Sequence, residues 1–213
     1  KVTGVYLIYK VLFLFIAVRL NAQNDSINLL IRQEASLNVL TFLNLIPEGR
    51  ERDYGFDSRS DFSQIKIEDP VQTYFVSSMN NKLTFISANE WRVPISVDGN
   101  FVSLLTVQMN NGNAEIVDFG GNKLAQKIQE FKKLYSGEAD QCVMIRNTFL
   151  NRDYMTLDFS SLYSQNDSSG LLDINVNSLN PIYQINEGQP IKTDVANFCS
   201  ETFEFISESN KKK

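Results

Sequence analysis

Residues 25–46 carry hydrophobic side chains at the spacing of an amphipathic helix. Asp25 or Ser26 can cap the start of this helix, because a short polar side chain accepts a hydrogen bond from an amide of the first turn. Pro47 and Gly49 follow and end the pattern. The apolar stripe consists of Ile27, Ile31, Ala35, Val39, Phe42 and Ile46, widened by Leu30 and Leu43. The spacing predicts a helix that buries one face.

From Val71 onward the hydrophobic period becomes that of β-strands. Asp98–Gly99 suits a two-residue hairpin turn, and Asn110–Asn113 suits a slightly longer one. The segments with strand character are 71–76, 83–87, 91–97, 101–109 and 114–119. Together they predict an antiparallel meander from Val71 to Phe119.

The strand over 91–97 has one hydrophobic and one mixed face. Trp91, Val93, Ile95 and Val97 point one way, and Arg92, Pro94 and Ser96 point the other way. Proline has no amide hydrogen to donate to a neighbouring strand. We therefore expect this strand at an edge of the sheet, unless Pro94 occupies a bulge or faces no neighbouring strand.

A second amphipathic helix is predicted over 123–135, with Asn122 as its cap and Gly137 as its end. A short helix is expected over 58–65. The last third of the chain repeats the strand pattern less clearly, over 141–149, 153–159, 171–176 and 181–185, before a closing helix over 194–207.

These elements predict an α+β fold in which helices cover a largely antiparallel sheet. A doubly wound parallel sheet would need strands and helices in alternation, and five strand-like segments follow one another here. We expect one domain or two intimately packed subdomains. The expected parts are a signal peptide (1–22), a helix, meander and helix (23–137), and a second strand-rich segment with a terminal helix packed on the first (138–213).

The N-terminal segment has the organisation of a secretory signal peptide. The uncharged apolar run Val11–Val18 follows Lys1 and Lys10, and Arg19 ends it well short of the ~20 apolar residues that a spanning helix needs. Ala22 offers a cleavage point. We predict a protein exported to the periplasm, the cell surface or the medium, without a transmembrane anchor after processing. The alternative is a buried N-terminal strand or helix.

Charge and residue content exclude several classes of function. The chain has 20 Lys and Arg against 25 Asp and Glu, and its net charge of -5 gives no basic footprint for nucleic acid. It contains no histidine, which excludes Ser-His-Asp and Cys-His catalysis and histidine-based zinc sites. No spacing matches a nucleotide-binding or calcium-binding loop. We expect no nucleic-acid partner, metal or cofactor.

Two pairs of residues remain candidates for chemistry or cross-linking. Asp153 and Asp158 could form a carboxylate pair for glycoside hydrolysis, although the sequence does not fix their separation. Cys142 and Cys199 are the only cysteines, and an exported chain meets an oxidising compartment. They are candidates for a disulfide; the alternative is that both are small buried core residues.

Several short motifs are similar to those of small exported Bacteroidetes proteins whose function is uncharacterised. They are Tyr54-Gly55-Phe56, then Trp91-Arg92-Val93-Pro94-Ile95 with Gly99 in the hairpin, then the strand-Gly-Gly-helix junction through Tyr135. The signal segment ending in Ala22-Gln23 also resembles export signals of that group. The resemblance covers mainly residues 54–135. It implies a location in the envelope or outside the cell and carries no catalytic residue to this chain.

Two functions follow as hypotheses. The first is a non-enzymatic binding module of the bacterial cell envelope, whose partner is a protein, peptide or glycan. The alternative is a hydrolase that acts on glycan or peptide through carboxylates or a Ser-Lys pair. A binding site is predicted at the aromatic segment with Tyr54 and Phe56 and at the strand with Trp91 and Arg92; the alternative, favoured because large aromatic residues are mostly buried, is that these aromatic residues fill the core.

Overall fold

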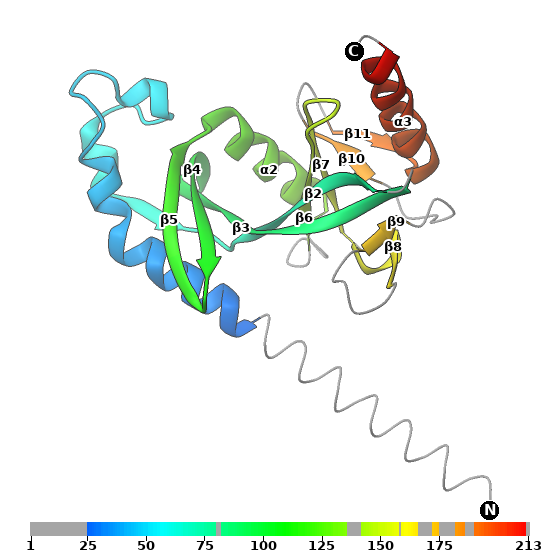
Figure 1. Ribbon diagram of the computed structural model, residues 1–213. Helices are drawn as coiled ribbons and strands as arrows, with labels where there is room; N and C mark the ends of the chain where they lie inside the picture. Colours follow the sequence, from blue (N-terminus) through cyan, green and yellow to red (C-terminus); the bar gives the residue numbers. More distant parts are fainter. Residues whose placement is uncertain are drawn as a thin grey trace, which may run out of the picture.

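The protein has an α+β fold built on one mixed, largely antiparallel sheet (Figure 1). The computed structural model describes residues 25–79, 82–135, 142–157, 159–165, 172–174, 182–185 and 190–211. The predicted signal peptide (1–22) lies outside the described residues. Within them the sheet has 11 strands, with the main order β11-β10-β7-β6-β2-β3-β4-β5.

The elements follow one another in three groups. A helix over residues 25–43, here called the N-terminal helix, precedes the 3-10 helices η1 (Glu51–Tyr54) and η2 (Arg59–Ser63). The central group comprises β1 (Ile65–Ile67), β2 (Val71–Met79), β3 (Lys82–Val97), β4 (Asn100–Asn110), β5 (Asn113–Gly120) and α2 (Asn122–Leu134). The last group comprises β6 (Val143–Asn147), β7 (Arg152–Thr156), η4 (Phe159–Leu162), β8 (Tyr163–Gln165), β9 (Leu172–Ile174), β10 (Ile182–Gln184), β11 (Ile191–Thr193) and α3 (Val195–Lys211).

The predicted meander is present, and every strand pair within 71–119 is antiparallel. The predicted strands 83–87 and 91–97 are one long strand, β3. The chain does not turn between them: Asn89 adopts a left-handed φ of 49°, and the register of β3 with β2 shifts there. Asp98 and Gly99 both have positive φ and form the expected two-residue turn. The next turn is also of two residues, since Asn110 pairs directly with Asn113.

Of the expected alternatives for Pro94, the edge is wrong, and a position whose missing amide faces no neighbouring strand is what the structure has. β3 lies between β2 and β4, and the end that carries Pro94 lies between β1 and β4. The carbonyl of Pro94 accepts a hydrogen bond of 2.9 Å from the amide of Glu68, in the connection between β1 and β2. Because the amide and carbonyl of one strand residue point to the same side, the missing N–H faces this irregular connection. A proline is tolerated here because no ladder bond is lost.

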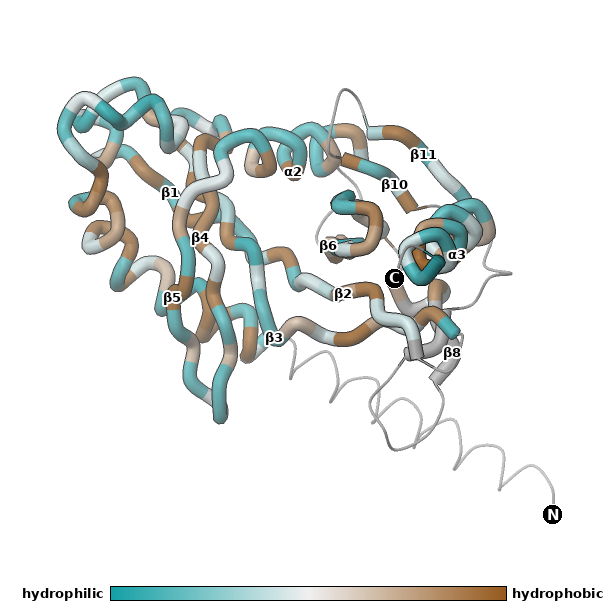
Figure 2. Tube along the Cα trace, turned by 45° about the horizontal axis from the view of Figure 1, so that its top comes forward, coloured by the Kyte–Doolittle hydropathy of each residue, from teal (hydrophilic) through white to brown (hydrophobic). Residues whose placement is uncertain are grey.

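Helices cover both faces of the sheet. The N-terminal helix packs on β3 and β4 through Ile31, Ala35, Val39 and Leu43, as the spacing predicts. On the opposite face, α2 packs through Ala125, Ile128 and Phe131. Figure 2 shows hydrophilic residues on the outer side of α2 and hydrophobic residues toward the sheet.

The strands of the last third continue the same sheet. β6 pairs in parallel with β2, and β7 and β10 follow it in antiparallel order. Alternate residues of these strands enter different cores: Met144 and Met155 lie in the cluster under α2, whereas Ile145 and Tyr154 lie in the cluster under α3. The closing helix is confirmed as α3. No helix in the described ranges is long and apolar enough to span a membrane.

Candidate functional site

The aromatic residues of the predicted binding site belong to the hydrophobic core. Phe56 and Trp91 are buried with Val93 and Ile95, and Tyr54 is half-buried. The Tyr54 ring stacks on Phe119, with centroids 5.5 Å apart and an interplanar angle of 7°. These side chains therefore fill the space between the N-terminal helix and the sheet, and they do not form an exposed surface.

Arg92 lies on the opposite face from Trp91, as the alternation predicts, but it is buried rather than accessible. Its Nη2 lies 2.7 Å from Glu90 Oε1, and its Nη1 donates to the hydroxyl of Thr106. Burial lowers the pKa of Arg92, opposed by the nearby charge of Glu90. The guanidinium is thus occupied by partners within the sheet.

The same face carries a second ion pair, on β6 and β7. Nε and Nη2 of Arg146 donate to Oδ1 and Oδ2 of Asp153 over 2.8 and 3.1 Å. This fork geometry is the strongest form of an arginine–carboxylate contact. The bond to Asp153 is the main reason that the pKa of Arg146 is raised, and the charge of Glu90 contributes to the same shift. Glu90, Arg92, Arg146 and Asp153 form a four-residue group that we call the charge cluster.

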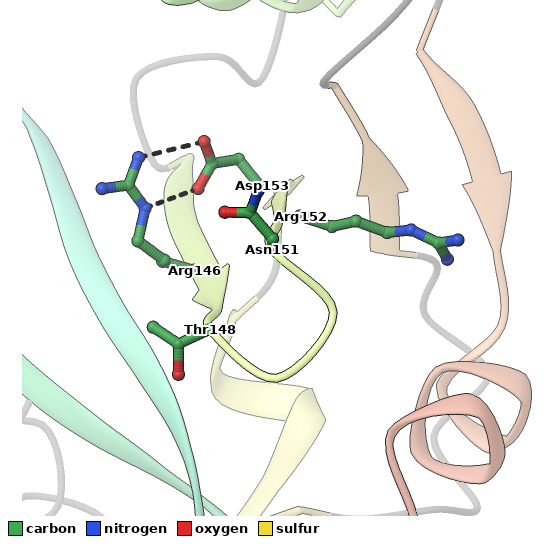
Figure 3. Close-up of a pocket in the computed structure, with 5 residues that line it drawn as sticks. All are labelled: Arg146, Thr148, Asn151, Arg152 and Asp153. Atoms are coloured by element: carbon green, nitrogen blue, oxygen red, sulfur yellow. Dashed lines mark hydrogen bonds and ion pairs between the residues drawn. The ribbon is translucent and has the colours of Figure 1, made fainter. Parts of the chain in front are cut away.

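A pocket of about 360 Å³ opens beside the second pair, at the turn of the β6–β7 hairpin (Figure 3). It is lined by Arg146, Thr148, Asn151, Arg152 and Asp153. In Figure 3, Arg146 and Asp153 face each other, whereas Arg152 points away from them. Nη1 of Arg152 is bonded to Glu201 of α3 at 2.6 Å. Arg146 is therefore the cation that the pocket can offer to a ligand.

The turn that forms the rim of the pocket is anchored to α3 through hydrogen bonds of Asn147. The buried Asn147 side chain accepts hydrogen bonds from the amides of Phe149 and Leu150, at 3.1 and 3.2 Å. Its Nδ2 donates to Thr202 of α3 at 2.8 Å, and Thr202 in turn donates to the carbonyl of Phe198 at 2.7 Å. This network fixes the turn to the helix, which pre-organises Thr148 and Asn151.

Both carboxylate oxygens of Asp153 accept a hydrogen bond from Arg146. Asp158, the other member of the predicted carboxylate pair, lies outside the described residues. Paired-carboxylate hydrolysis needs one carboxyl to act as an acid and one as a base or nucleophile. The described residues that line the pocket bring hydrogen-bonding side chains to it and one carboxylate, that of Asp153.

The two cysteines are not joined by a disulfide. Both are buried, but Cys142 lies in the cluster under α2 and Cys199 lies in the cluster under α3. The sheet separates these clusters, so the sequence-based pairing of Cys142 with Cys199 is not present in this fold. Burial raises the pKa of the Cys199 thiol to about 11.

Two alkylation labels should appear only after unfolding. In folded protein at pH 8 the Cys199 thiol is protonated and buried, so iodoacetamide should react slowly; in denaturant without reductant, mass spectrometry should count two labels. Because the folded pKa exceeds the unfolded value, this thiol favours the fold below pH 9 and that contribution declines as the pH rises toward 11. A denatured, unreduced sample that takes no label would contradict the unbridged state.

Sequence reasoning missed Arg146, Thr148 and Asn151. One signal was available: a basic and an acidic residue, Arg146 and Asp153, occupy the two predicted strands on either side of a short connection. A hairpin closed over 148–151 would place them opposite each other, where unlike charges attract. The predicted strand 141–149 ran into this turn and moved the expected connection to 150–152, which concealed the pairing.

Comparison with known proteins found no matching protein family, curated protein or solved structure.

Proposed function

We propose that the protein is an exported binding module of the bacterial cell envelope whose pocket holds a carboxylate of a peptide or glycan. The observation that carries the proposal is Arg146: it lines the pocket, is half-exposed, and is fixed in orientation by its two bonds to Asp153. Arginine recognises carboxylates through planar N–H groups, and an arginine held in advance loses little freedom on binding.

The donors around the pocket suit one carboxylate. Nη1 of Arg146 has no hydrogen-bond partner among the described residues, and Thr148 and Asn151, which carry a hydroxyl and an amide, line the same pocket. A carboxylate can accept from all three groups, since its two oxygens offer about four acceptor positions.

The charge balance favours a singly charged group over a phosphate dianion. Arg146 is balanced by Asp153, and Arg152 is balanced by Glu201, so the pocket has little excess positive charge. Three hydrogen bonds of about 1.5 kcal/mol each are largely offset by the cost of association, so an isolated carboxylate should bind weakly, with a dissociation constant above about 1 mM. Neighbouring groups of a peptide or sugar would tighten this.

A titration followed by NMR tests the proposal. A short peptide with a free C-terminal carboxylate, its amidated form, galacturonate and inorganic phosphate are added separately to the labelled protein. The free peptide or galacturonate should shift the resonances of the 146–153 turn, whereas the amidated peptide and phosphate should not. The comparison of peptide with galacturonate identifies the source of the carboxylate.

Two variants give the expected loss. Arg146→Gln should abolish the shifts, and Thr148→Val, which leaves the Arg146–Asp153 pair intact, should weaken binding by about fivefold to tenfold. The matched control is Arg32→Gln, because Arg32 also pairs with an aspartate, Asp69 at 2.7 Å, but outside the pocket. Binding that survives both pocket variants, or is lost equally in the control, contradicts the proposal.

A further inference from the structure

The outer side of the N-terminal helix exposes leucine residues that no part of the described chain covers. Leu29, Leu30, Leu37 and Leu40 are 67%, 44%, 71% and 54% exposed. Their helix buries its inner stripe completely, with Ile31, Ala35 and Leu43 at 0%. In Figure 1 this helix (blue) lies at the outside of the β3–β4–β5 layer. The outer leucines therefore do not contribute to the hydrophobic core under this helix.

The exposed side chains form a heptad stripe. Leu30, Gln33, Leu37 and Leu40 on the helix, and Asn44 directly after it, are all exposed and follow one another at intervals of three, four, three and four residues. The amide of Asn44 still bonds to the carbonyl of Leu40, which continues the helical path. That order is the seam of a two-helix coiled coil, in which alternating three- and four-residue steps keep one line of side chains toward a partner helix. We call these five residues the leucine stripe.

The leucine stripe contains no charge. The helix has a basic residue, Arg32, but its Nη1 is paired with Asp69 at 2.7 Å, and the flanking carboxylate of Glu34 accepts from Asn38 at 2.9 Å. A surface of this kind meets an identical surface without like-charge repulsion, even though the whole chain carries a net charge of -5. Helices that bind membranes are instead rich in Lys and Arg.

We propose that the leucine stripe pairs with the leucine stripe of a second copy of this chain, with the two helices parallel and in register. This register brings Leu30, Leu37 and Leu40 against their own counterparts. It also brings Gln33 against Gln33 and Asn44 against Asn44 of the second copy, so that the buried amides bond to each other rather than face leucine. The inference is independent of the carboxylate pocket, which lies on the β6–β7 hairpin.

The interface is that of a weak dimer. A helix of this length is about 28 Å long and about 10 Å wide, which gives roughly 300 Å² per copy, below the ~800 Å² of a standard stable interface. We therefore expect a dissociation constant on the order of 10–100 μM. The protein should be monomeric when dilute and dimeric at high concentration.

Sedimentation equilibrium over a concentration series tests the pairing. The protein is recovered after export and its N-terminus verified by mass, so that the apolar run before Arg19 is absent. Leu37→Glu should weaken dimerisation by at least about 100-fold, because two buried leucines are lost and two carboxylates meet. Gln33→Leu should strengthen it by at least about tenfold. The matched control is Leu134→Glu, which changes a leucine that is 57% exposed at the end of α2.

Disulfide trapping tests the register. Leu30→Cys alone should form a cross-linked dimer on mild oxidation, since residue 30 meets residue 30 in the parallel pair. If cross-links form only in a mixture of Leu30→Cys and Leu40→Cys chains, the parallel register is overturned. A chain that stays monomeric at all concentrations, or a Leu37→Glu variant that associates like wild type, overturns the pairing itself; binding to vesicles or to another protein through the same leucines would then identify a different occupant.

Discussion

Replacement of Gly55 by alanine should destabilise the fold by about 3–5 kcal/mol, enough to unfold a protein of ordinary stability. Gly55 ends η1 with φ at 94°, a region that side chains avoid. A Cβ atom built there would lie 1.9 Å from the carbonyl oxygen of Val102 and 2.9 Å from Cβ of Asn122. Because the nearest atom is backbone of β4, the clash is relieved only by moving a strand of the sheet.

Gly49→Ala is the control for Gly55→Ala. Gly49 also has positive φ, 80°, but a Cβ there would meet no atom within 4 Å. Gly49→Ala should therefore lower the free energy of unfolding only by the conformational strain of alanine at positive φ, about 1 kcal/mol. Urea unfolding followed by circular dichroism measures both variants. Equal losses in the two would mean that the approach of Gly55 to β4 does not limit stability.

The second large effect concerns the buried pair of Glu90 and Arg92. Glu90→Leu should cost about 3 kcal/mol, because it leaves the Arg92 guanidinium buried without its carboxylate. The double variant with Arg92→Met should return to within about 1 kcal/mol of the original stability or exceed it. The reason is that the pair is imperfect: Arg92 Nε has no partner among the described residues, and the 2.7 Å contact to Glu90 Oε1 lacks hydrogen-bond geometry.

A double-mutant cycle measures this coupling by chemical denaturation. The exposed pair of Arg32 and Asp69 serves as the comparison, since its charged atoms are also 2.7 Å apart but both side chains are about half-exposed. Breaking that pair should cost less than about 1 kcal/mol. A coupling energy at Glu90 and Arg92 no larger than at the exposed pair would show that the buried charges are solvated.

The elements with long periodic patterns were predictable. The N-terminal helix, α2, α3 and the meander each carry enough apolar residues at one period to identify the element and its buried face. Short strands such as β1, β8 and β11 were missed, because three residues give no period. They form where a neighbouring strand offers unpaired backbone N–H and C=O groups, which the sequence of the short strand itself does not show.

The site was less predictable than the fold, for a reason that Trp91 illustrates. A large aromatic residue in an alternating strand serves either a core or a surface, and only the helix packed above it decides which. Pro94 is similar. Its missing amide hydrogen correctly indicated a position where no hydrogen bond to a neighbouring strand is formed, but that position faces the connection between β1 and β2 and is not at the border of the sheet. Arg146 becomes notable only when the hairpin register places Asp153 opposite it.

The parallel pairing of β6 with β2 imposes an order on assembly. Strands β2 to β5 follow one another closely along the chain and can pair through local contacts. Strand β6 comes after α2 and pairs with β2, so its hydrogen bonds can form only once β2 is in place. Since the N-terminal part of a chain is synthesised first, β2 would wait with one side unpaired until the rest arrives. During that interval its free side is exposed to mispairing with another chain, and a delay in synthesis after α2 would lengthen the risk.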